Sequence, residues 1–515
     1  VLEDHYRWEI PVPYVFDESL DLNARGVVLR AFEQIRLKTC IDFKPREDEP
    51  NYIVVIQDDG CWSYVGNQRQ GSQNLSIGQW CDLLAIVEHE FLHALGFWHE
   101  QSRYDRDDYV TILWENIEKG EEHNFLKHSS NYTTTLGTMY DYTSVMHYGK
   151  DAFSNGNGST IITNLPQYQD VIGQRQEMSS NDVLKLQKLY NCTSAVTFLA
   201  SCSFEDERVC DVTLCATGNV SWERVASIEA GPFSDHTSLS GGFFMHCSTA
   251  SGKEGDGTKM QSRKMNPKRQ LQCLQFFCFH SGSDQDQLNI WIREYDGDSK
   301  ETTYLMGQII GGVYIPQIKF EVRKGAGNPS GGFSIDDMNI FETACPHHVW
   351  HIPYFDHFLT NSSVGTSLLS PRFLTRQRYG LQLLLYLYPN HFGVFFRLVS
   401  TDHDDQLQWP CAWRQVTVTL LDQSHHIQQR MSKEISITTD LERMFTGDNG
   451  EIFHYWDNPR KVGDLITDAS GESYYAGPNL GYRKFLSFDT FWSGNFMKEN
   501  SVFFLLSFEG MCYNS

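Results

Sequence analysis

The residues best suited to chemistry in this chain are three histidines and a glutamate within the segment VEHEFLHALGFWHEQ. On a helix, His89 and His93 lie four residues apart and project from one face, so both rings can bind the same ion. A left-handed glycine at Gly96 would end that helix and allow the chain to return with His99 as a third nitrogen ligand. Three histidines are a ligand set of catalytic zinc, and they leave a coordination position open for water.

Glu90 is next to the first histidine, where a carboxylate can act as the general base of metal-assisted hydrolysis. Zinc lowers the pKa of a bound water to roughly 7, so a neighbouring carboxylate can take its proton and pass it to a departing amine. The pattern predicts one catalytic Zn²⁺ and the hydrolysis of peptide bonds. Two alternatives explain less: a buried helix with ordinary core histidines gives no reason for the spacing, and a structural zinc gives no reason for Glu90.

The apolar run around the motif, CDLLAIVEHEFLHALG, predicts the helix that must carry it. Upstream, NARGVVLRAFEQIRLKT has the apolar spacing of a second helix, and NYIVVIQ alternates like a strand. Downstream, SSNDVLKLQKLYNC predicts a third helix that begins at a cluster of capping residues. Residues 1–193 are therefore predicted to form an α+β domain.

Beyond that domain the sequence changes to short alternating strands separated by Gly, Ser and Asp, the pattern of β-sandwiches. LNIWIREY and KFEVRK belong to a first such region, residues 196–345, and YGLQLLLYLY and SVFFLLSF belong to a second, residues 346–512. A chain of 515 residues is also too long for one core. We therefore expect a multidomain fold, in which the α+β domain is followed by two all-β sandwich domains.

The charge of the chain excludes several classes of partner. Its formal net charge is −23, and no run of Lys or Arg offers a cationic face to phosphates. Nucleic acid and anionic lipid are therefore not expected partners. No stretch approaches the roughly 18 apolar residues of a membrane helix, so we expect no membrane span within this chain.

Thirteen cysteines, none in a C-x-x-C pair, favour disulfides over structural zinc and indicate an oxidising compartment. Six sequons agree with passage through the secretory pathway. These candidate glycosylation sites are Asn74, Asn131, Asn157, Asn191, Asn219 and Asn361. We therefore expect an extracellular or cell-surface protein.

HEFLHALGFWHE together with SVMHY resembles the astacin branch of the metzincin metallopeptidases. The resemblance implies a zincin-like protease fold, with Met146 in a turn beneath the zinc and Tyr148 able to bind the metal at rest and then stabilise the oxyanion. It also implies that Glu100 pairs with the mature N-terminal amine in a buried salt bridge. Taken singly, Met146 would be a core residue, Tyr148 an amphipathic surface residue and Glu100 a solvated acid.

The same resemblance implies two disulfides in this domain. Cys61 with Cys81 would close a short loop, and Cys40 with Cys192 would tie the ends of the domain together. The segment between Cys61 and Cys81 resembles the edge-strand region of the family, which can hold an extended polypeptide substrate by backbone hydrogen bonds.

The two β-domains resemble known extracellular modules. CSFEDERVC and GGFSIDDMNI resemble a MAM domain, in which Cys202 and Cys345 are expected in disulfides with partners left open. DDQLQWPCAWRQVTVTLLDQ and NPRKVG resemble a MATH (TRAF-like) domain. Protease, MAM and MATH in this order is the meprin arrangement, which implies a homodimer or higher oligomer. A disulfide between subunits is one option, with Cys247 as its candidate; the alternative is a bond within the chain from Cys247 to Cys215 or Cys278.

Arg175, in VIGQR, stands where the family can line the S1′ pocket, and a partly buried guanidinium favours a substrate carboxylate. The alternative for Arg175 is an ordinary surface or structural salt bridge. Glu121 occupies the position at which strongly acid-selective relatives carry a second arginine, and it would repel such a substrate. The expected preference for acidic P1′ residues is therefore mild.

Together these features predict a secreted or cell-surface zinc metalloendopeptidase that hydrolyses extracellular proteins and peptides with a metal-activated water. The alternative is an adhesion or scaffold protein whose MAM and MATH domains bind partners and whose catalysis is vestigial. Proteins whose catalysis is vestigial usually lose a metal ligand or the catalytic base. This chain retains the whole set, namely His89, Glu90, His93, His99 and Tyr148.

Overall fold

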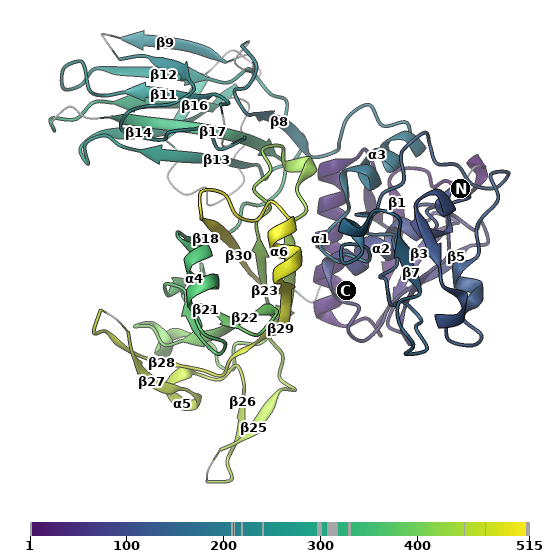
Figure 1. The fold of residues 1–515 in the computed structure, drawn as a ribbon. Coiled ribbons are helices and arrows are strands. Elements are labelled where there is room, and N and C mark those ends of the chain that lie inside the picture. Colours follow the sequence, from purple (N-terminus) through teal and green to yellow (C-terminus); the bar gives the residue numbers. More distant parts are fainter. Residues whose placement is uncertain are drawn as a thin grey trace.

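The computed structural model describes residues 3–207, 210, 212–217, 220–238, 241–295, 301–305, 318–327, 331–447, 449–468 and 470–510. Figure 1 shows three units in chain order: an N-terminal domain of helices and strands, then two β-rich domains. We call these the N-terminal domain (to residue 193), the middle domain (196–345) and the C-terminal domain (from 346). The arrangement confirms the predicted fold class, with a few short helices added to the last domain.

The N-terminal domain places helices against a mainly parallel sheet. Its strand order is β2-β1-β3-β5-β4, in which β4 pairs antiparallel with β5 and forms an edge. In chain order its helices and strands are β1 (Val12–Phe16), α1 (Leu22–Lys38), β2 (Phe43–Pro45), β3 (Tyr52–Ile56), β4 (Cys61–Ser63), β5 (Ser72–Ile77), α2 (Leu84–Ala94), β6 (Val110–Ile112), β7 (Ile161–Thr163) and α3 (Ser180–Leu189).

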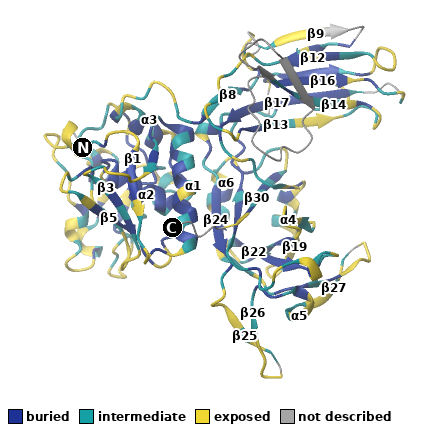
Figure 2. Ribbon diagram, turned by 180° about the vertical axis from the view of Figure 1, so that it is seen from behind, coloured by how far each residue is buried: buried dark blue, intermediate teal, exposed yellow. Residues whose placement is uncertain are grey.

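Helices α1 and α2 form where the sequence predicts them, and both bury apolar side chains. Asp21 caps α1 by accepting a hydrogen bond from the backbone N–H of Asn23. From α1, Phe32 stacks on Phe43 of β2 and meets Phe91 of α2 edge to face, with ring centroids 3.9 and 4.9 Å apart. Figure 2 shows that α2 is buried along its length. The helix that carries the histidine motif is therefore fixed in the core.

The middle domain is an antiparallel sandwich of two sheets. One sheet has the order β10-β11-β17-β13, with β8 also paired to β17, and the other has the order β15-β14-β16-β12-β9. The strands are β8 (Phe198–Cys202), β9 (Thr213–Thr217), β10 (Trp222–Val225), β11 (Phe244–Ser248), β12 (Gly257–Gln261), β13 (Cys273–His280), β14 (Gln287–Tyr295), β15 (Glu301–Leu305), β16 (Ile318–Arg323) and β17 (Gly332–Phe341).

The C-terminal domain is a second antiparallel sandwich. Its smaller sheet has the order β18-β30-β23-β24, its larger sheet is built on β21 and β22, and the hairpin β25–β26 projects with exposed residues (Figure 2). The elements are β18 (His348–Ile352), α4 (Phe355–Asn361), β19 (Ser367–Leu369), β20 (Phe373–Leu374), β21 (Gly380–Leu387), β22 (His391–Val399), β23 (Arg414–Leu420), β24 (Lys433–Thr438), β25 (Met444–Thr446), β26 (Ile452–His454), α5 (Pro459–Val462), β27 (Asp464–Thr467), β28 (Ser473–Ala476), β29 (Leu480–Ser487), α6 (Phe488–Ser493) and β30 (Val502–Gly510).

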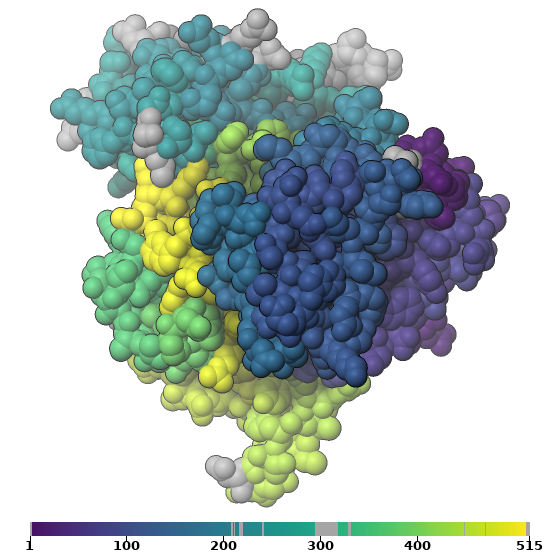
Figure 3. Space-filling view, turned by 45° about the vertical axis from the view of Figure 1, so that its right-hand side comes forward, coloured from purple at the N-terminus to yellow at the C-terminus, as the bar shows by residue number. Residues whose placement is uncertain are grey.

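Helix α1 is where the three domains meet. It contacts β8 of the middle domain, and it contacts β24 and the short helix at Ile427–Gln429 of the C-terminal domain. Arg30 of α1 forms a paired contact with Glu434 of β24, with nitrogen–oxygen distances of 2.8 and 3.1 Å. Figure 3 shows the resulting body, with the N-terminal domain in purple and blue packed beside the C-terminal domain in green and yellow.

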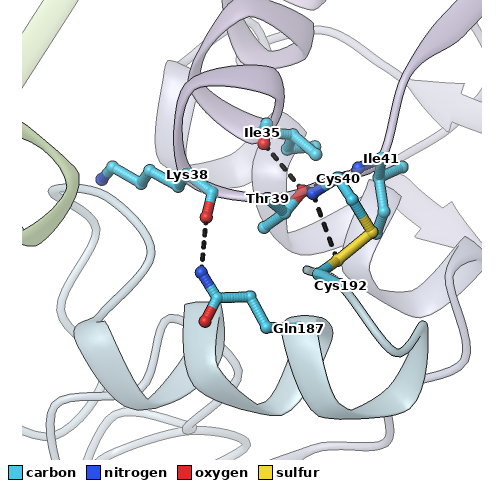
Figure 4. Close-up of a disulfide and its surroundings, with 7 residues drawn as sticks. All are labelled: Ile35, Lys38, Thr39, Cys40, Ile41, Gln187 and Cys192. Atoms are coloured by element: carbon cyan, nitrogen blue, oxygen red, sulfur yellow. Dashed lines mark hydrogen bonds between the residues drawn. A yellow bond between two sulfur atoms is a disulfide. The ribbon is translucent and has the colours of Figure 1, made fainter. Parts of the chain in front are cut away.

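A disulfide between Cys40 and Cys192 joins the chain just after α1 to the chain just after α3 (Figure 4). The backbone N–H of Cys40 points to Cys192 Sγ at 3.2 Å, and Gln187 of α3 donates to the carbonyl of Lys38 at 2.8 Å. The two helix ends are therefore held by covalent and hydrogen bonds together. Across the described residues, every helix falls short of the length and apolar character needed to cross a membrane.

Candidate active site

The three histidines converge on one point. Helix α2 ends at Ala94, and Gly96 then adopts a φ of 110°, which turns the chain back toward the helix. This turn brings His99 Nε2 to 3.2 Å from His89 Nε2 and to 3.1 Å from His93 Nε2. Four ligands at the usual zinc–nitrogen distance stand about 3.3 Å from one another in a tetrahedron. The two distances from His99 Nε2 match that geometry.

Carbonyl groups orient two of the rings. His89 Nδ1 donates to the Val145 carbonyl at 2.8 Å, and His93 Nδ1 donates to the Phe97 carbonyl at 2.7 Å. Because a carbonyl only accepts, each Nδ1 carries the proton and each Nε2 keeps its lone pair for a metal. Burial lowers the pKa of His93 to about 4 and holds the pKa values of His89 and His99 well below the ordinary value. All three rings are therefore neutral and able to bind a cation.

Glu90 is buried beside this cluster, with 4% of its surface exposed. Burial raises the pKa of Glu90 to about 8, although the nearby Arg175 charge opposes that shift. Within the described structure its Oε2 is buried and has no hydrogen-bond partner. A buried carboxylate oxygen without a partner, on the residue that follows the first of the three histidines, fits a site built for Zn²⁺ and its water.

Tyr148 lies against His99. Its ring centroid is 4.3 Å from that of His99, and its backbone N–H donates to Gln101 Oε1 at 3.1 Å. Burial raises the pKa of Tyr148 to about 12, so the phenol keeps its proton at neutral pH. The structure thus places a hydrogen-bond donor close to the three histidines.

Helix α3 supports the segment around Met146, which is 1% exposed and packs in the same core as α2. Asp182, in the first turn of α3, accepts hydrogen bonds from Ser144 Oγ at 2.6 Å and from the Val145 N–H at 2.9 Å. Asp182 and Ser179 also form a capping box. The sequence predicted the cap at the start of this helix but did not connect Asp182 with the metal site.

Glu100 is buried and fully paired. Its carboxylate lies 2.5 Å from Lys185 Nζ and 3.1 Å from Arg103 Nη1, and it accepts from the Asp141 N–H at 3.0 Å. These partners compensate the buried charge, which would otherwise carry a large desolvation cost. The expected pairing of Glu100 with the mature N-terminal amine concerns the start of the chain, where residues 1 and 2 lie outside the described residues.

Arg175 reaches the same region from the segment before α3. Its Nη1 donates to the carbonyls of Gln174 at 2.8 Å and Val145 at 3.2 Å, so Arg175 and His89 share the Val145 oxygen. Among the described residues Arg175 forms no ion pair within 4 Å. What the structure shows for its guanidinium are hydrogen bonds to backbone carbonyls. Glu121 accepts a hydrogen bond from Asn124 at 2.7 Å and is half-buried.

Four disulfides are present in the described residues. Cys40 bonds to Cys192 and Cys61 to Cys81, as the family resemblance implied, and the partners that the sequence left open are Cys210 for Cys202 and Cys273 for Cys345. The expected glycosylation sites Asn74, Asn131, Asn157, Asn191 and Asn361 have exposed side chains, and Asn219 lies outside the described residues.

Cys247 does not fit the role of an intersubunit cysteine. It lies on β11 in the core of the middle domain with 0% of its surface exposed, and burial raises its thiol pKa to about 12. It also forms no bond to Cys215 or Cys278, and both of these are unpaired. The sequence could not reveal this burial, because it depends on the packing of one sheet against the other.

Comparison with family models divides the chain into three consecutive matches. Residues 1–191 match the astacin peptidase family, residues 202–346 match the MAM domain described as meprin/A5/mu, and residues 347–508 match the MATH domain.

Individual proteins with all three regions are also similar. Meprin A subunit beta of Homo sapiens is 47% identical over 533 residues, covering all of this chain and 75% of that protein. Meprin A subunit alpha of Rattus norvegicus is 38% identical, covering 98% of this chain and 70% of that protein. Among solved structures, high choriolytic enzyme 1, a hatching-enzyme zinc protease of Oryzias latipes, is 39% identical, covers 37% of this chain and 98% of its own, and has a TM-score of 0.35.

Proposed function

The chain belongs to the meprin family of astacin zinc metalloendopeptidases, and from this premise we propose that it is secreted or cell-surface and hydrolyses extracellular proteins and peptides. The proposal includes a mild preference for acidic residues at P1′. One observation carries the assignment as a zinc peptidase: three imidazoles present their Nε2 atoms to one point, and Glu90, the residue after the first of them, has a buried carboxylate oxygen without a hydrogen-bond partner among the described residues.

His89, His93 and His99 would hold the zinc, whose chemistry when bound is to acidify a water and to polarise the scissile carbonyl. Glu90 is proposed as the base that takes the proton from that water and returns it to the departing amine. Tyr148 is proposed as a hydrogen-bond donor to the carbonyl oxygen as negative charge develops there.

Strand β4 is proposed to hold the substrate backbone. It is the edge of its sheet, so one side of its backbone is open to an added strand. Gly66, three residues beyond its end, donates to the His93 carbonyl at 2.9 Å, which places this region against α2 and the metal ligands. A substrate paired with β4 would pass the three histidines in an extended form, as a polypeptide does.

The proposed location rests on the covalent chemistry of the chain. The described residues contain four disulfides, which persist in oxidising compartments, and five of the six sequons expose their asparagine. By similarity to the meprin subunits we propose a homodimer or higher oligomer. The net charge of −23 argues against nucleic acid as a partner.

The test compares the activated protein with Glu90→Gln. Both proteins should contain one zinc per chain by elemental analysis, and the variant should cleave a peptide library at least about 10³-fold more slowly, because only the base is lost. His93→Ala serves as the contrasting control that loses zinc together with activity. Equal cleavage by wild type and Glu90→Gln would reject the mechanism. Zinc binding without turnover in the wild type would favour the adhesion or scaffold alternative.

The P1′ preference is tested separately with peptides that vary only at P1′. Arg175→Met should lower the ratio of kcat/KM for Asp over Ala at P1′ about tenfold, the scale of one charge-assisted contact. Absence of Asp and Glu enrichment in the wild type would remove this part of the proposal and leave the peptidase assignment intact.

A further inference from the structure

The segment 174–178, which carries Arg175, is anchored to the N-terminal domain from within. Gln174 Nε2 donates to the Thr143 carbonyl at 2.9 Å, and the Met178 N–H donates to Glu88 Oε2 at 2.9 Å. Glu88 precedes the metal ligand His89 on α2. The segment is thus linked directly to the helix that positions the active site.

The C-terminal domain holds the same segment from the opposite side. Lys433, the first residue of β24, donates from Nζ to the Arg175 carbonyl, and the Ser432 N–H donates to Glu177 Oε2 at 3.1 Å. Lys433 is separated from Arg175 by 258 positions and is 9% exposed. Two contacts therefore fix the residue proposed to line S1′ and its near neighbour to another domain.

Glu177 is itself held rigidly. Its Oε1 lies 2.6 Å from Lys38 Nζ, and Lys38 Nζ also donates to the Arg430 carbonyl of the C-terminal domain at 2.8 Å. Figure 4 shows the Lys38 side chain extending away from the Cys40–Cys192 bond toward that domain. The contact from Ser432 therefore reaches a carboxylate that cannot move freely.

Burying a lysine here costs desolvation free energy, which a residue whose only role is to join two domains need not incur. Burial and the nearby Arg175 charge lower the pKa of Lys433 to about 8, so its charged form is disfavoured in the folded protein. A buried apolar side chain of similar size would join the surfaces without that desolvation cost. What a methionine cannot supply is a directional hydrogen bond to one carbonyl oxygen.

We propose that Lys433 is a positioning residue for the peptidase: by binding the Arg175 carbonyl, the C-terminal domain sets the orientation of the Arg175 guanidinium toward an acidic P1′ side chain. The inference rests on the proposed P1′ role of Arg175. On this proposal the N-terminal and C-terminal domains together determine P1′ selectivity. If Arg175 acted without Lys433, the selectivity would depend on the N-terminal domain alone.

The test uses the full chain and a pair of peptides with Asp or Ala at P1′. Lys433→Met should lower the Asp-over-Ala ratio of kcat/KM about fivefold, the effect of losing one hydrogen bond to a charged donor. Hydrolysis of the Ala peptide should change less than about twofold, since Arg175 does not contact an alanine side chain. Lys433→Gln is a second variant for the case of poor folding; its amide nitrogen is one bond closer to the backbone, so it weakens the contact and should lower the ratio as well.

Arg30→Met is the matched control, because it too removes one cation from the contact between the N-terminal and C-terminal domains, but this cation pairs with Glu434 and not with the segment 174–178. The ratio should stay unchanged in Arg30→Met. The double variant Arg175→Met/Lys433→Met should show no further fall beyond Arg175→Met alone, since the lysine acts through that arginine.

The inference is overturned if Arg175→Met lowers the ratio and both Lys433 variants leave it unchanged, or if Arg30→Met lowers it equally. A different result, no effect of Arg175→Met itself, would reject the P1′ role of Arg175 and the positioning role of Lys433 with it. Glu90→Gln tests peptidase activity independently of both outcomes.

Discussion

Asp182 Oδ1 accepts a hydrogen bond from Ser144 Oγ at 2.6 Å, and this contact ties the first turn of α3 to the metal site. The other oxygen of the same carboxylate accepts from the N–H of Val145, whose carbonyl orients His89. One buried carboxylate thus supports a metal ligand through a single intervening residue.

Asp182→Ala should therefore weaken both folding and zinc binding. Loss of the cap and of two hydrogen bonds to buried groups should lower the free energy of unfolding by about 2–4 kcal/mol. Zinc affinity should fall about 10- to 100-fold, as for other residues that orient a metal ligand. Denaturant titration and competition with a fluorescent chelator measure the two effects. Asp170→Ala, which breaks the exposed pair with Lys150, is the control and should cost less than about 1 kcal/mol.

The two disulfides of the N-terminal domain should differ in their contribution to stability. Cys40–Cys192 spans 152 positions and Cys61–Cys81 spans 20, which the chain-entropy model converts to about 5 and about 3 kcal/mol. Replacing Cys40 and Cys192 by alanine should accordingly shift the unfolding midpoint further than replacing Cys61 and Cys81. The reverse order in denaturant titrations would show that the longer loop is already restrained by its non-covalent contacts.

Removing the metal should abolish hydrolysis and lower the melting temperature. A ligand that binds only the folded state stabilises it, and the three neutral imidazoles provide zinc with a site that the unfolded chain lacks. After dialysis against a chelator, one equivalent of Zn²⁺ should restore activity and melting temperature. Mg²⁺ should restore neither, because it prefers oxygen ligands. An unchanged melting curve after zinc removal would contradict this expectation.

The stability of the protein should carry a pH dependence that comes from Lys433. Its folded pKa, about 8, lies below its ordinary value of 10.5, so between those values the unfolded chain binds more protons at this residue. The free energy of unfolding then rises with pH over that window through this group. Relative to Lys433→Met, the wild type should gain about 1–3 kcal/mol between pH 8 and 10. Paired denaturant titrations at several pH values measure the difference, and parallel curves would disprove it.

The sequence was sufficient for features that depend on local pattern. The spacing of His89, His93 and His99 and the glycine at Gly96 predicted a cluster that the structure brings together. Alternating apolar residues predicted the two sandwiches, because a strand with one buried face carries its own period. These signals need only a few neighbouring residues.

The sequence pattern did not predict contacts between segments that are far apart in the chain. The hydrogen bond from Lys433 to Arg175 joins positions 258 apart, and neither residue differs in local sequence from an ordinary surface cation. The burial of Cys247 likewise follows from how two sheets face each other. Such features depend on how sheets pack within a domain and how domains pack on one another, which a single sequence does not specify by periodicity.

The central place of α1 has a consequence for limited proteolysis. Its Arg36 carbonyl accepts from the Val196 N–H at 2.9 Å, its Arg30 pairs with Glu434, and Cys192 is bonded to Cys40 just past its end. A nick in either interdomain connection would therefore leave fragments that travel as one particle through a sizing column. Only denaturing electrophoresis would reveal the cut.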